Sequence, residues 1–181
     1  MSQENVEAVS GPRVTASSGR SFPTFPAAIV VPIVNRQEEF LLLRNPRHRS
    51  LWQPVNGAVE AGETLLDAAL REVREEAGPT LRVRPLGVVH ASTFAYDAHV
   101  STMISVVYVM AHEGGDAMPG DDMRGSEVRW ATLGTITSEQ LRLLPPLDQP
   151  WLRQRAFDLF RLYVDGPDVT LQGRLTSGLE E

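Results

Sequence analysis

Apolar residues are spaced differently from one segment of the chain to the next, and these changes predict its secondary structure. Apolar, β-branched runs over residues 27–35 and 40–44 predict two strands joined by a hairpin turn. Residues 81–90 and 100–111 predict two longer strands, and residues 127–131 predict a short one. Strands on both sides of one helical segment favour an α+β fold in which helices pack on a mixed sheet.

A central helix is predicted between the second and third of these strands. Thr64 suits its N-cap, with Asp67 three residues later, and Gly78 with Pro79 predicts its end. The apolar residues recur at intervals of three and four, so they share one face: Leu66, Ala69, Leu70, Val73 and Ala77.

The C-terminal part of the chain predicts two more helices. A short helix covers residues 138–144 and stops before Pro145. A longer helix follows Asp148 as its N-cap, and Pro150 fits its first turn.

Length and composition predict a single domain. The chain has 181 residues, of which 42% are hydrophobic, and this is enough for one core. Residues 1–24 and 166–181 lack an apolar period, so we expect a flexible tail on each side of a domain at residues 25–165.

Charge and cysteine content narrow the possible chemistry. The absence of cysteine excludes disulfides, thiolate metal sites and cysteine catalysis. The net charge of −6 argues against binding long nucleic acid, but small phosphorylated substrates remain open because a metal ion supplies positive charge locally. The apolar runs are too short to cross a bilayer and no signal peptide is visible, so we expect no membrane partner and a cytoplasmic location.

Three carboxylates stand out on the central helix. Glu72, Glu75 and Glu76 are spaced i, i+3 and i+4, so they share a face away from the apolar set. Like charges at this spacing destabilise a helix slightly, and a bound cation would offset that cost. Carboxylate oxygens suit Mg²⁺ or Mn²⁺. A solvated helix face is the simpler alternative for these three residues alone.

The loop before the helix adds to this pattern. Glu63 and Arg71 are placed to form a carboxylate–guanidinium pair that fixes the loop against the helix. Gly57 and Gly62 allow the loop backbone to approach a ligand closely, and a backbone carbonyl there is a further potential metal ligand.

The whole segment resembles the signature of the Nudix hydrolase family. It consists of Gly57, five residues, Glu63, seven residues, and then Arg71-Glu72-Val73-Arg74-Glu75-Glu76-Ala77-Gly78. Seven fixed positions match, and a chance match is on the order of 10⁻⁸ per start position at average residue usage. Pro79 is the one departure, because the family has an aliphatic residue there.

The resemblance implies a fold and an activity. The fold is a mixed β-sheet sandwiched between helices in a single domain, with the signature as a loop–helix–loop. The activity is Mg²⁺-dependent hydrolysis of a diphosphate linkage by an activated water, with Mn²⁺ as an alternative metal. It assigns the metal to Gly57, Glu72, Glu75 and Glu76.

The catalytic roles follow from the same resemblance. Glu63 and Arg71 would hold the loop. The general base would be a signature glutamate such as Glu75, or a glutamate on a later loop, for which Glu127 is the candidate. Its alternative role is an exposed charge at a strand edge.

Two residues are candidates for substrate contact. Arg44 ends a predicted strand and suits a phosphate oxygen. Tyr96 lies 17 residues beyond Pro79, where family members that act on dinucleoside polyphosphates often carry a stacking tyrosine.

The sequence leaves the substrate open. The residues around Trp52 also look like members that hydrolyse nucleoside triphosphates. No coenzyme A pattern is present, and Thr93 and Phe94 occupy the region where ADP-ribose hydrolases often carry a proline. Similar isomerases need a catalytic cysteine, which this chain lacks.

Two wider questions are also open. The alternative function is a non-catalytic nucleotide-binding regulator on the same fold, although such proteins usually lose signature glutamates and this chain keeps them. Many similar proteins are homodimers, but no feature of the sequence locates an interface.

Overall fold

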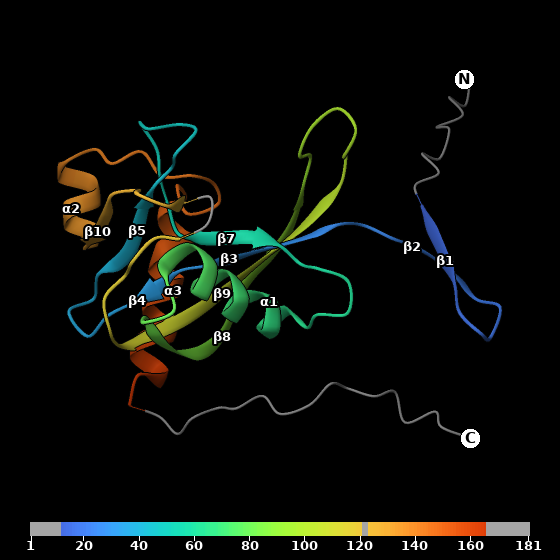
Figure 1. Cartoon of the computed structure of the whole chain (residues 1–181), viewed down its shortest axis with the longest axis horizontal. Coiled ribbons are helices and arrows are strands. Elements are labelled where there is room, and N and C mark those ends of the chain that lie inside the picture. The colour runs from blue at the N-terminus through green and yellow to red at the C-terminus, as the bar shows by residue number, and fades with distance from the viewer. Residues whose placement is uncertain (1–11, 121–122, 166–181) are drawn as a thin grey trace, which may run out of the picture.

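The computed structural model describes residues 12–120 and 123–165 (Figure 1). Its strands are β1 (Arg13–Thr15), β2 (Ser21–Pro23), β3 (Ala27–Val31), β4 (Ile33–Val34), β5 (Phe40–Arg44), β6 (Trp52–Gln53), β7 (Val55–Ala58), β8 (Arg82–Phe94), β9 (Met103–Gly114) and β10 (Val128–Ala131). Its helices are α1 (Leu65–Glu72), the π-helix η1 (Val73–Ala77), α2 (Leu133–Ser138) and α3 (Pro150–Tyr163). None of the helices in the described ranges is long and apolar enough to span a membrane.

Eight strands of the described chain form one mixed sheet. The order is β10-β5-β4-β9-β3-β7, with β6 paired to β5 and β8 paired to β9. β9 runs parallel to β3 and β4, while the other pairings are antiparallel. β7 is therefore an edge strand beside β3, and it carries Gly57 of the signature.

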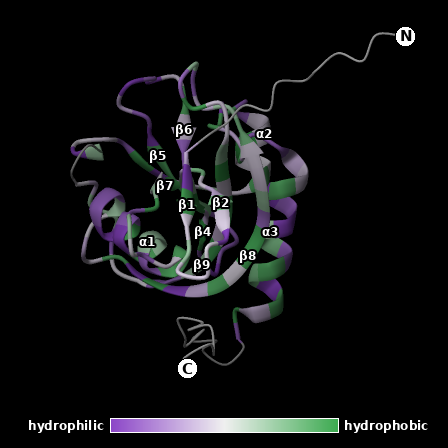
Figure 2. Ribbon diagram, turned by 90° about the vertical axis from the view of Figure 1, so that its right-hand side faces the viewer, coloured by the Kyte–Doolittle hydropathy of each residue, from purple (hydrophilic) through white to green (hydrophobic). Residues whose placement is uncertain are grey.

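Two helices cover the two faces of this sheet, as Figure 2 shows with α1 and α3 on opposite sides of the strands. Alternate residues of β5 explain why both faces are apolar. Leu41 and Leu43 join the core with α1, whereas Phe40 and Leu42 join the core with α3. The predicted sandwich of a mixed sheet between helices is confirmed.

The N-terminal residues differ from the expected tail in one respect. Residues 13–23 form a β1–β2 hairpin, in which Arg13 also hydrogen bonds to Ser21 at 3.0 Å. Figure 1 draws this hairpin apart from the main sheet. Flexibility of the N-terminal segment 1–24 stays a prediction. Its first eleven residues and the expected C-terminal tail at 166–181 lie outside the described residues.

The short helix predicted over residues 138–144 is wrong. The helix α2 lies earlier, at Leu133–Ser138, because Thr132 caps its first turn. Gln140 then adopts a positive φ of 51°, which ends helical geometry. The residues beyond it run beside β6 instead.

Smaller corrections concern α3 and the segment before the signature. α3 has Gln149 as its N-cap rather than Asp148, while Pro150 does occupy the first turn. β6 and β7 were not predicted as strands, since each is short and Pro54 separates them.

The helix exit explains the departure at Pro79. Gly78 ends η1 with a positive φ of 99°, and the N–H of Leu81 donates to its carbonyl at 3.3 Å. Pro79 is exposed and Leu81 is buried in the core. The buried aliphatic residue after the helix is therefore Leu81, two positions later than in the family signature, and the turn that ends the helix still forms.

Candidate functional site

The signature begins with a reciprocal cap at the start of α1. The Thr64 hydroxyl accepts a hydrogen bond from the N–H of Asp67 at 3.1 Å, and the Asp67 carboxylate accepts one from the N–H of Thr64 at 3.2 Å. These bonds satisfy two N–H groups that no helical carbonyl reaches. The predicted cap is confirmed, and it fixes where α1 begins relative to the loop.

Arg71 is the centre of the polar network between loop and helix. It donates two bonds to the Glu63 carboxylate, at 2.8 and 3.0 Å, and one to the carbonyl of Ala58 at 2.8 Å. It also reaches the carboxylates of Glu72, at 2.7 Å, and Glu75, at 2.9 Å. One guanidinium thus ties the loop, the edge strand and the acidic helix face together.

This network changes the acidity of its members. Hydrogen bonding to Glu63 is the main cause that raises the pKa of Arg71. Reciprocally, the Arg71 guanidinium, followed by the N–H of Glu60, holds the pKa of the Glu63 carboxyl below its usual value. Both groups are therefore held in their charged forms.

Two of the three helix carboxylates lie against the edge strand β7. Glu72 and Glu76 are only 8% and 5% exposed. The Glu76 carboxylate accepts a hydrogen bond from the N–H of Asn56 at 2.9 Å. Glu72 fills the space next to Gly57, where a Cβ atom would overlap its carboxylate. Gly57 thus leaves room for the Glu72 carboxylate, which would have to move if residue 57 had a side chain.

The helix widens where the acidic residues lie. The π-helical turn η1 at Val73–Ala77 includes Glu75 and Glu76, and such turns are frequent at functional sites. The loop that follows β9 packs on the end of this turn. A Cβ on Gly78 would lie 2.5 Å from the carbonyl oxygen of Met118, which shows how closely the two segments approach.

The donor set fits a hard divalent cation in its chemistry. Glu72, Glu76 and the Gly57 backbone offer only oxygen ligands, which Mg²⁺ and Mn²⁺ prefer. The side chains do not already converge on one point, since among the described residues no three acidic or histidine side chains are close enough to hold a metal ion. Arg71 instead holds Glu72 and Glu75.

Two other predicted residues form a separate pair. Arg44 donates to the Glu127 carboxylate at 3.0 Å and to the carbonyl of Arg49 at 3.0 Å. Its guanidinium also lies 4.0 Å from the ring centre of Trp52. Arg44, the candidate phosphate ligand, and Glu127, the second candidate base, thus form an ion pair with each other and are not part of the network around Arg71.

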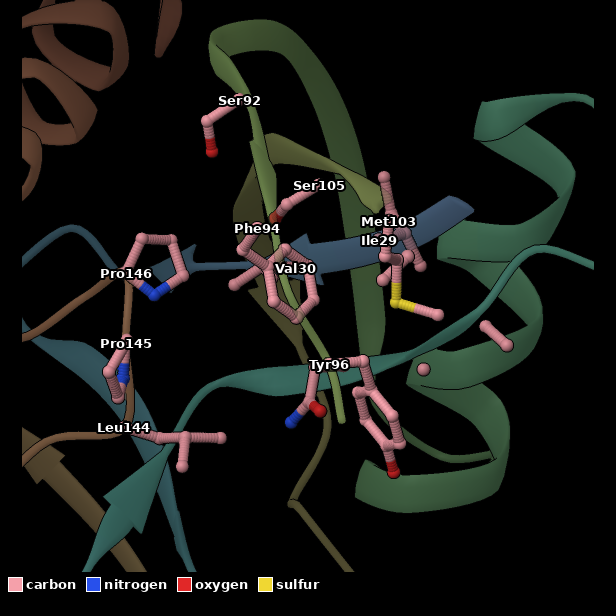
Figure 3. Close-up of a pocket in the computed structure, with 14 residues that line it drawn as sticks. Ile29, Val30, Ser92, Phe94, Tyr96, Met103, Ser105, Leu144, Pro145 and Pro146 are labelled. Atoms are coloured by element: carbon pink, nitrogen blue, oxygen red, sulfur yellow. The ribbon is translucent and has the colours of Figure 1, made fainter. Parts of the chain in front are cut away.

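A cavity of about 560 Å³ adjoins the signature on β7. Asn56 and Gly57 contribute to its lining, and so does Tyr96, the predicted stacking residue. Figure 3 shows Tyr96 beside β7 and Phe94 above it on the β8–β9 hairpin. The fold therefore brings Tyr96 next to the signature, as its predicted role requires.

Several lining residues carried no signal in the sequence. Ser92, Ser105 and the pair Pro145–Pro146 come from distant segments and belong to no motif. Ser92 and Ser105 meet only through the register between β8 and β9, and this register shifts at three irregular points that the sequence pattern does not reveal.

Comparison with known proteins identifies the family. The NUDIX domain profile matches residues 23–155. The chain belongs to the NUDIX family. A solved NUDIX hydrolase from Nitrosomonas europaea has the same fold, with a TM-score of 0.59 and 18% identity, over 83% of this chain and 98% of that one.

Two curated NUDIX relatives have related names. The chain is 32% identical over 105 residues to an ADP-ribose pyrophosphatase of Methanocaldococcus jannaschii, covering 56% of this chain and 60% of the relative. It is 30% identical over 115 residues to the NAD-capped RNA hydrolase NudC of Photobacterium profundum, covering 63% of this chain and 40% of the relative. The match thus spans less than two thirds of either relative's length.

Proposed function

We propose that this NUDIX protein is a divalent-metal-dependent hydrolase that cleaves a diphosphate linkage in a nucleotide-type substrate. The observation that carries the proposal is the burial of Glu72 and Glu76 against Asn56 and Gly57, the same two residues at which the cavity begins. The two curated relatives, a pyrophosphatase and a hydrolase by name, support the reaction class.

The proposed metal ligands are Glu72, Glu75, Glu76 and the carbonyl of Gly57. Mg²⁺ is the proposed ion, and Mn²⁺ is chemically suited to the same oxygens. A divalent cation bound there would neutralise charge on the diphosphate and make a water molecule more acidic. These residues lie on two adjoining parts of the fold, the continuous helix α1–η1 and the strand β7. Small side-chain movements would therefore bring their oxygen atoms to one cation.

The chain's own residues would divide the remaining tasks. Water attacks one phosphorus, its proton passes to a carboxylate, and the bond from that phosphorus to the bridging oxygen breaks as the second phosphate group leaves with the electron pair. Glu75 is our preferred base because its side chain is 42% exposed beside the buried pair. Glu127 is the alternative base, and it would first have to leave Arg44.

Glu63 and Arg71 would act by holding the site in place. Their two-point contact joins the loop to α1, and Arg71 reaches the β7 carbonyl of Ala58 as well. Without that contact the loop would lose its fixed distance to the acidic face.

Nucleoside triphosphates and dinucleoside polyphosphates are the proposed substrates. Tyr96 would stack on a base, since its side chain is 62% exposed at the mouth of the cavity. Arg44 would contact a phosphate group further along the substrate, at the expense of its pair with Glu127.

A substrate panel with and without metal tests the proposal. Nucleoside triphosphates, dinucleoside polyphosphates, nucleotide sugars and ADP-ribose would be incubated with the protein in Mg²⁺, Mn²⁺ or EDTA, and products separated by chromatography. We expect a metal-dependent product from at least one class, and its identity names the bond cleaved. Folded protein that stays inactive across the panel would contradict the proposal and favour a nucleotide-binding regulator.

A further inference from the structure

The cavity beside β7 has a lining that is unusual for a protein that handles phosphates. Fourteen described residues line its volume of about 560 Å³, and none of them carries a charge. A cavity of this size accommodates a small molecule. Its occupant should therefore be the uncharged part of a substrate, with the phosphates lying towards Gly57 and the acidic helix.

The floor of the cavity is one row of small side chains across four strands. The sheet register pairs Ser92 on β8 with Ser105 on β9, Ser105 with Ala28 on β3, and Ala28 with Ala58 on β7. Partners in such a row point to the same face of the sheet. Because all four side chains are small, the face is hollowed along this row.

Larger residues border the row on both sides. Two positions away along the strands, Phe94 pairs with Met103 on one side, and Val30 pairs with Asn56 on the other. These four residues also line the cavity. The hollow is thus a slot bounded by bulky rows rather than a shallow depression.

Ser105 adds a polar group to the floor of the slot. It is 4% exposed and lines the cavity. A serine hydroxyl can both donate and accept a hydrogen bond. A polar edge of a bound group would hydrogen bond to this hydroxyl, and Ser92, its partner across β8 and β9, lies beside it (Figure 3).

Flat apolar side chains face the slot from two sides. Figure 3 shows Phe94 and Tyr96 on one side and Pro145 with Pro146 on the other. The residues directly after the two prolines are fixed by α3, because Arg153 donates hydrogen bonds to the carbonyls of Leu147 and Asp148 at 2.7 and 2.8 Å. Aromatic faces and proline rings suit a planar group between them.

From these observations we infer that the slot is a nucleobase subsite in which Ser105, with Ser92, hydrogen bonds the edge of the base. The inference rests on the proposed hydrolase function and specifies which part of the substrate is recognised. The small row Ser92–Ser105–Ala28–Ala58 sets the depth of the subsite, and Ser105 selects a group with a hydrogen-bonding edge over an apolar chain.

Binding of a nucleotide fragment without metal tests this directly. AMP and ribose 5-phosphate share sugar and phosphate and differ only in the base, so calorimetric titration of both isolates the base contribution. We expect AMP to bind about tenfold more tightly, as one stacked base provides. Equal affinities, or geranyl monophosphate binding more tightly than AMP, would overturn the subsite.

Two variants locate the effect in the slot. Ala28→Leu fills the floor and should abolish the preference for AMP, while Ser105→Ala should weaken AMP binding about fivefold, the loss of one hydrogen bond. Ala91→Leu is the matched control, because Ala91 adjoins Ser92 on β8 but is exposed and outside the lining. Thermal unfolding checks that each variant folds. A preference retained in both slot variants would refute the assignment.

The titration separates this inference from the proposed function. Hydrolysis across the substrate panel without preference for AMP would refute the subsite and leave the hydrolase proposal intact. Preference for AMP in a folded protein that hydrolyses nothing would support the subsite and refute the hydrolase.

Discussion

The two faces of the edge strand β7 differ in almost every property. On the α1 side, Arg71 and four carboxylates form a charged and hydrogen-bonded network around Gly57: Glu63, Glu72, Glu75 and Glu76. On the α3 side, the cavity is lined by uncharged residues and has a floor of Ser and Ala. The four-residue strand β7 thus separates a charged hydrogen-bonded network from an uncharged cavity.

The charged and the uncharged half of this site are encoded in different ways in the sequence. The charged half comes from 22 consecutive residues, so residue spacing alone reveals it. The uncharged half comes from strands and a loop that are distant in sequence, and only the sheet register brings them together. Reaction chemistry and substrate choice can therefore change separately.

Loss of a carboxylate on the charged side of β7 should reduce activity most. Glu76→Gln should lower kcat by about 10²–10³-fold or more, because a proposed metal ligand loses its charge. The amide oxygen can still accept the hydrogen bond from Asn56, so the fold should survive. Steady-state kinetics with saturating Mg²⁺ measure the rate, and circular dichroism checks the fold.

The same variant sharpens the contrast between the two faces. Glu76→Gln should leave AMP affinity unchanged, since the slot lies on the other side of β7. Glu60→Gln, an exposed carboxylate in the same loop, is the control and should keep full activity. A normal rate in Glu76→Gln would contradict the metal assignment.

A smaller loss of stability and activity is expected from a change at Gly57, which contacts the charged network and also lines the cavity. In Gly57→Ala the new Cβ overlaps the Glu72 carboxylate, which must move. We expect about 1–3 kcal/mol lower stability in urea unfolding and about tenfold lower activity. Gly134→Ala is the control, because its Cβ makes only an ordinary contact at 3.6 Å within α2.

A double variant shows whether the overlap is the cause. Once Glu72→Ala has removed the carboxylate, Gly57→Ala should cost little stability, which gives a coupling energy in a double-mutant cycle. Equal costs of Gly57→Ala with and without Glu72 would show that the close approach is not the reason for glycine at this position.

The smallest effect concerns the pH dependence of the loop. Arg71 holds the pKa of the Glu63 carboxyl below its ordinary value, so this pair stabilises the folded state fully at any pH well above that ordinary value. The contribution is lost as pH falls through the lowered pKa. Glu63→Gln should therefore unfold more easily than the parent at pH 7, and the difference should shrink at acidic pH.

Urea unfolding from pH 7 to pH 3 measures this difference. In an Arg71→Ala background, the pH-dependent difference between the parent and Glu63→Gln should become smaller, because the largest cause that lowers the pKa of Glu63 is absent and only weaker ones such as the N–H of Glu60 remain. A gap between parent and Glu63→Gln that stays constant down to pH 3 would contradict the assignment.

Sequence patterns predicted those parts of the molecule whose determinants are local. The strand β5 at residues 40–44 and the Thr64 cap agree with the structure residue by residue, since a run of buried apolar residues and a three-residue capping interval are both short-range signals. The contacts of Arg71 with Glu63 follow from the same local spacing.

The remaining parts depend on contacts that no local signal contains. The helix predicted at 138–144 failed because Gln140 leaves helical geometry and the chain then follows β6. The pairing of Arg44 with Glu127 joins residues 83 positions apart, and the slot floor joins four strands. Tyr96 was found only through the family resemblance, not through its surroundings.

The number of residues in the signature helix determines the direction in which each of its side chains points. Each residue of an α-helix is rotated by about 100° from its neighbour, and a π-helical turn with its i→i+5 hydrogen bonds contains more residues than an α-helical turn. With η1 as the last turn, Glu76 accepts the hydrogen bond from Asn56 and Gly78 packs closely on Met118. An inserted or deleted residue here would turn one of these contacts away, so length is as strict a requirement of this segment as residue type.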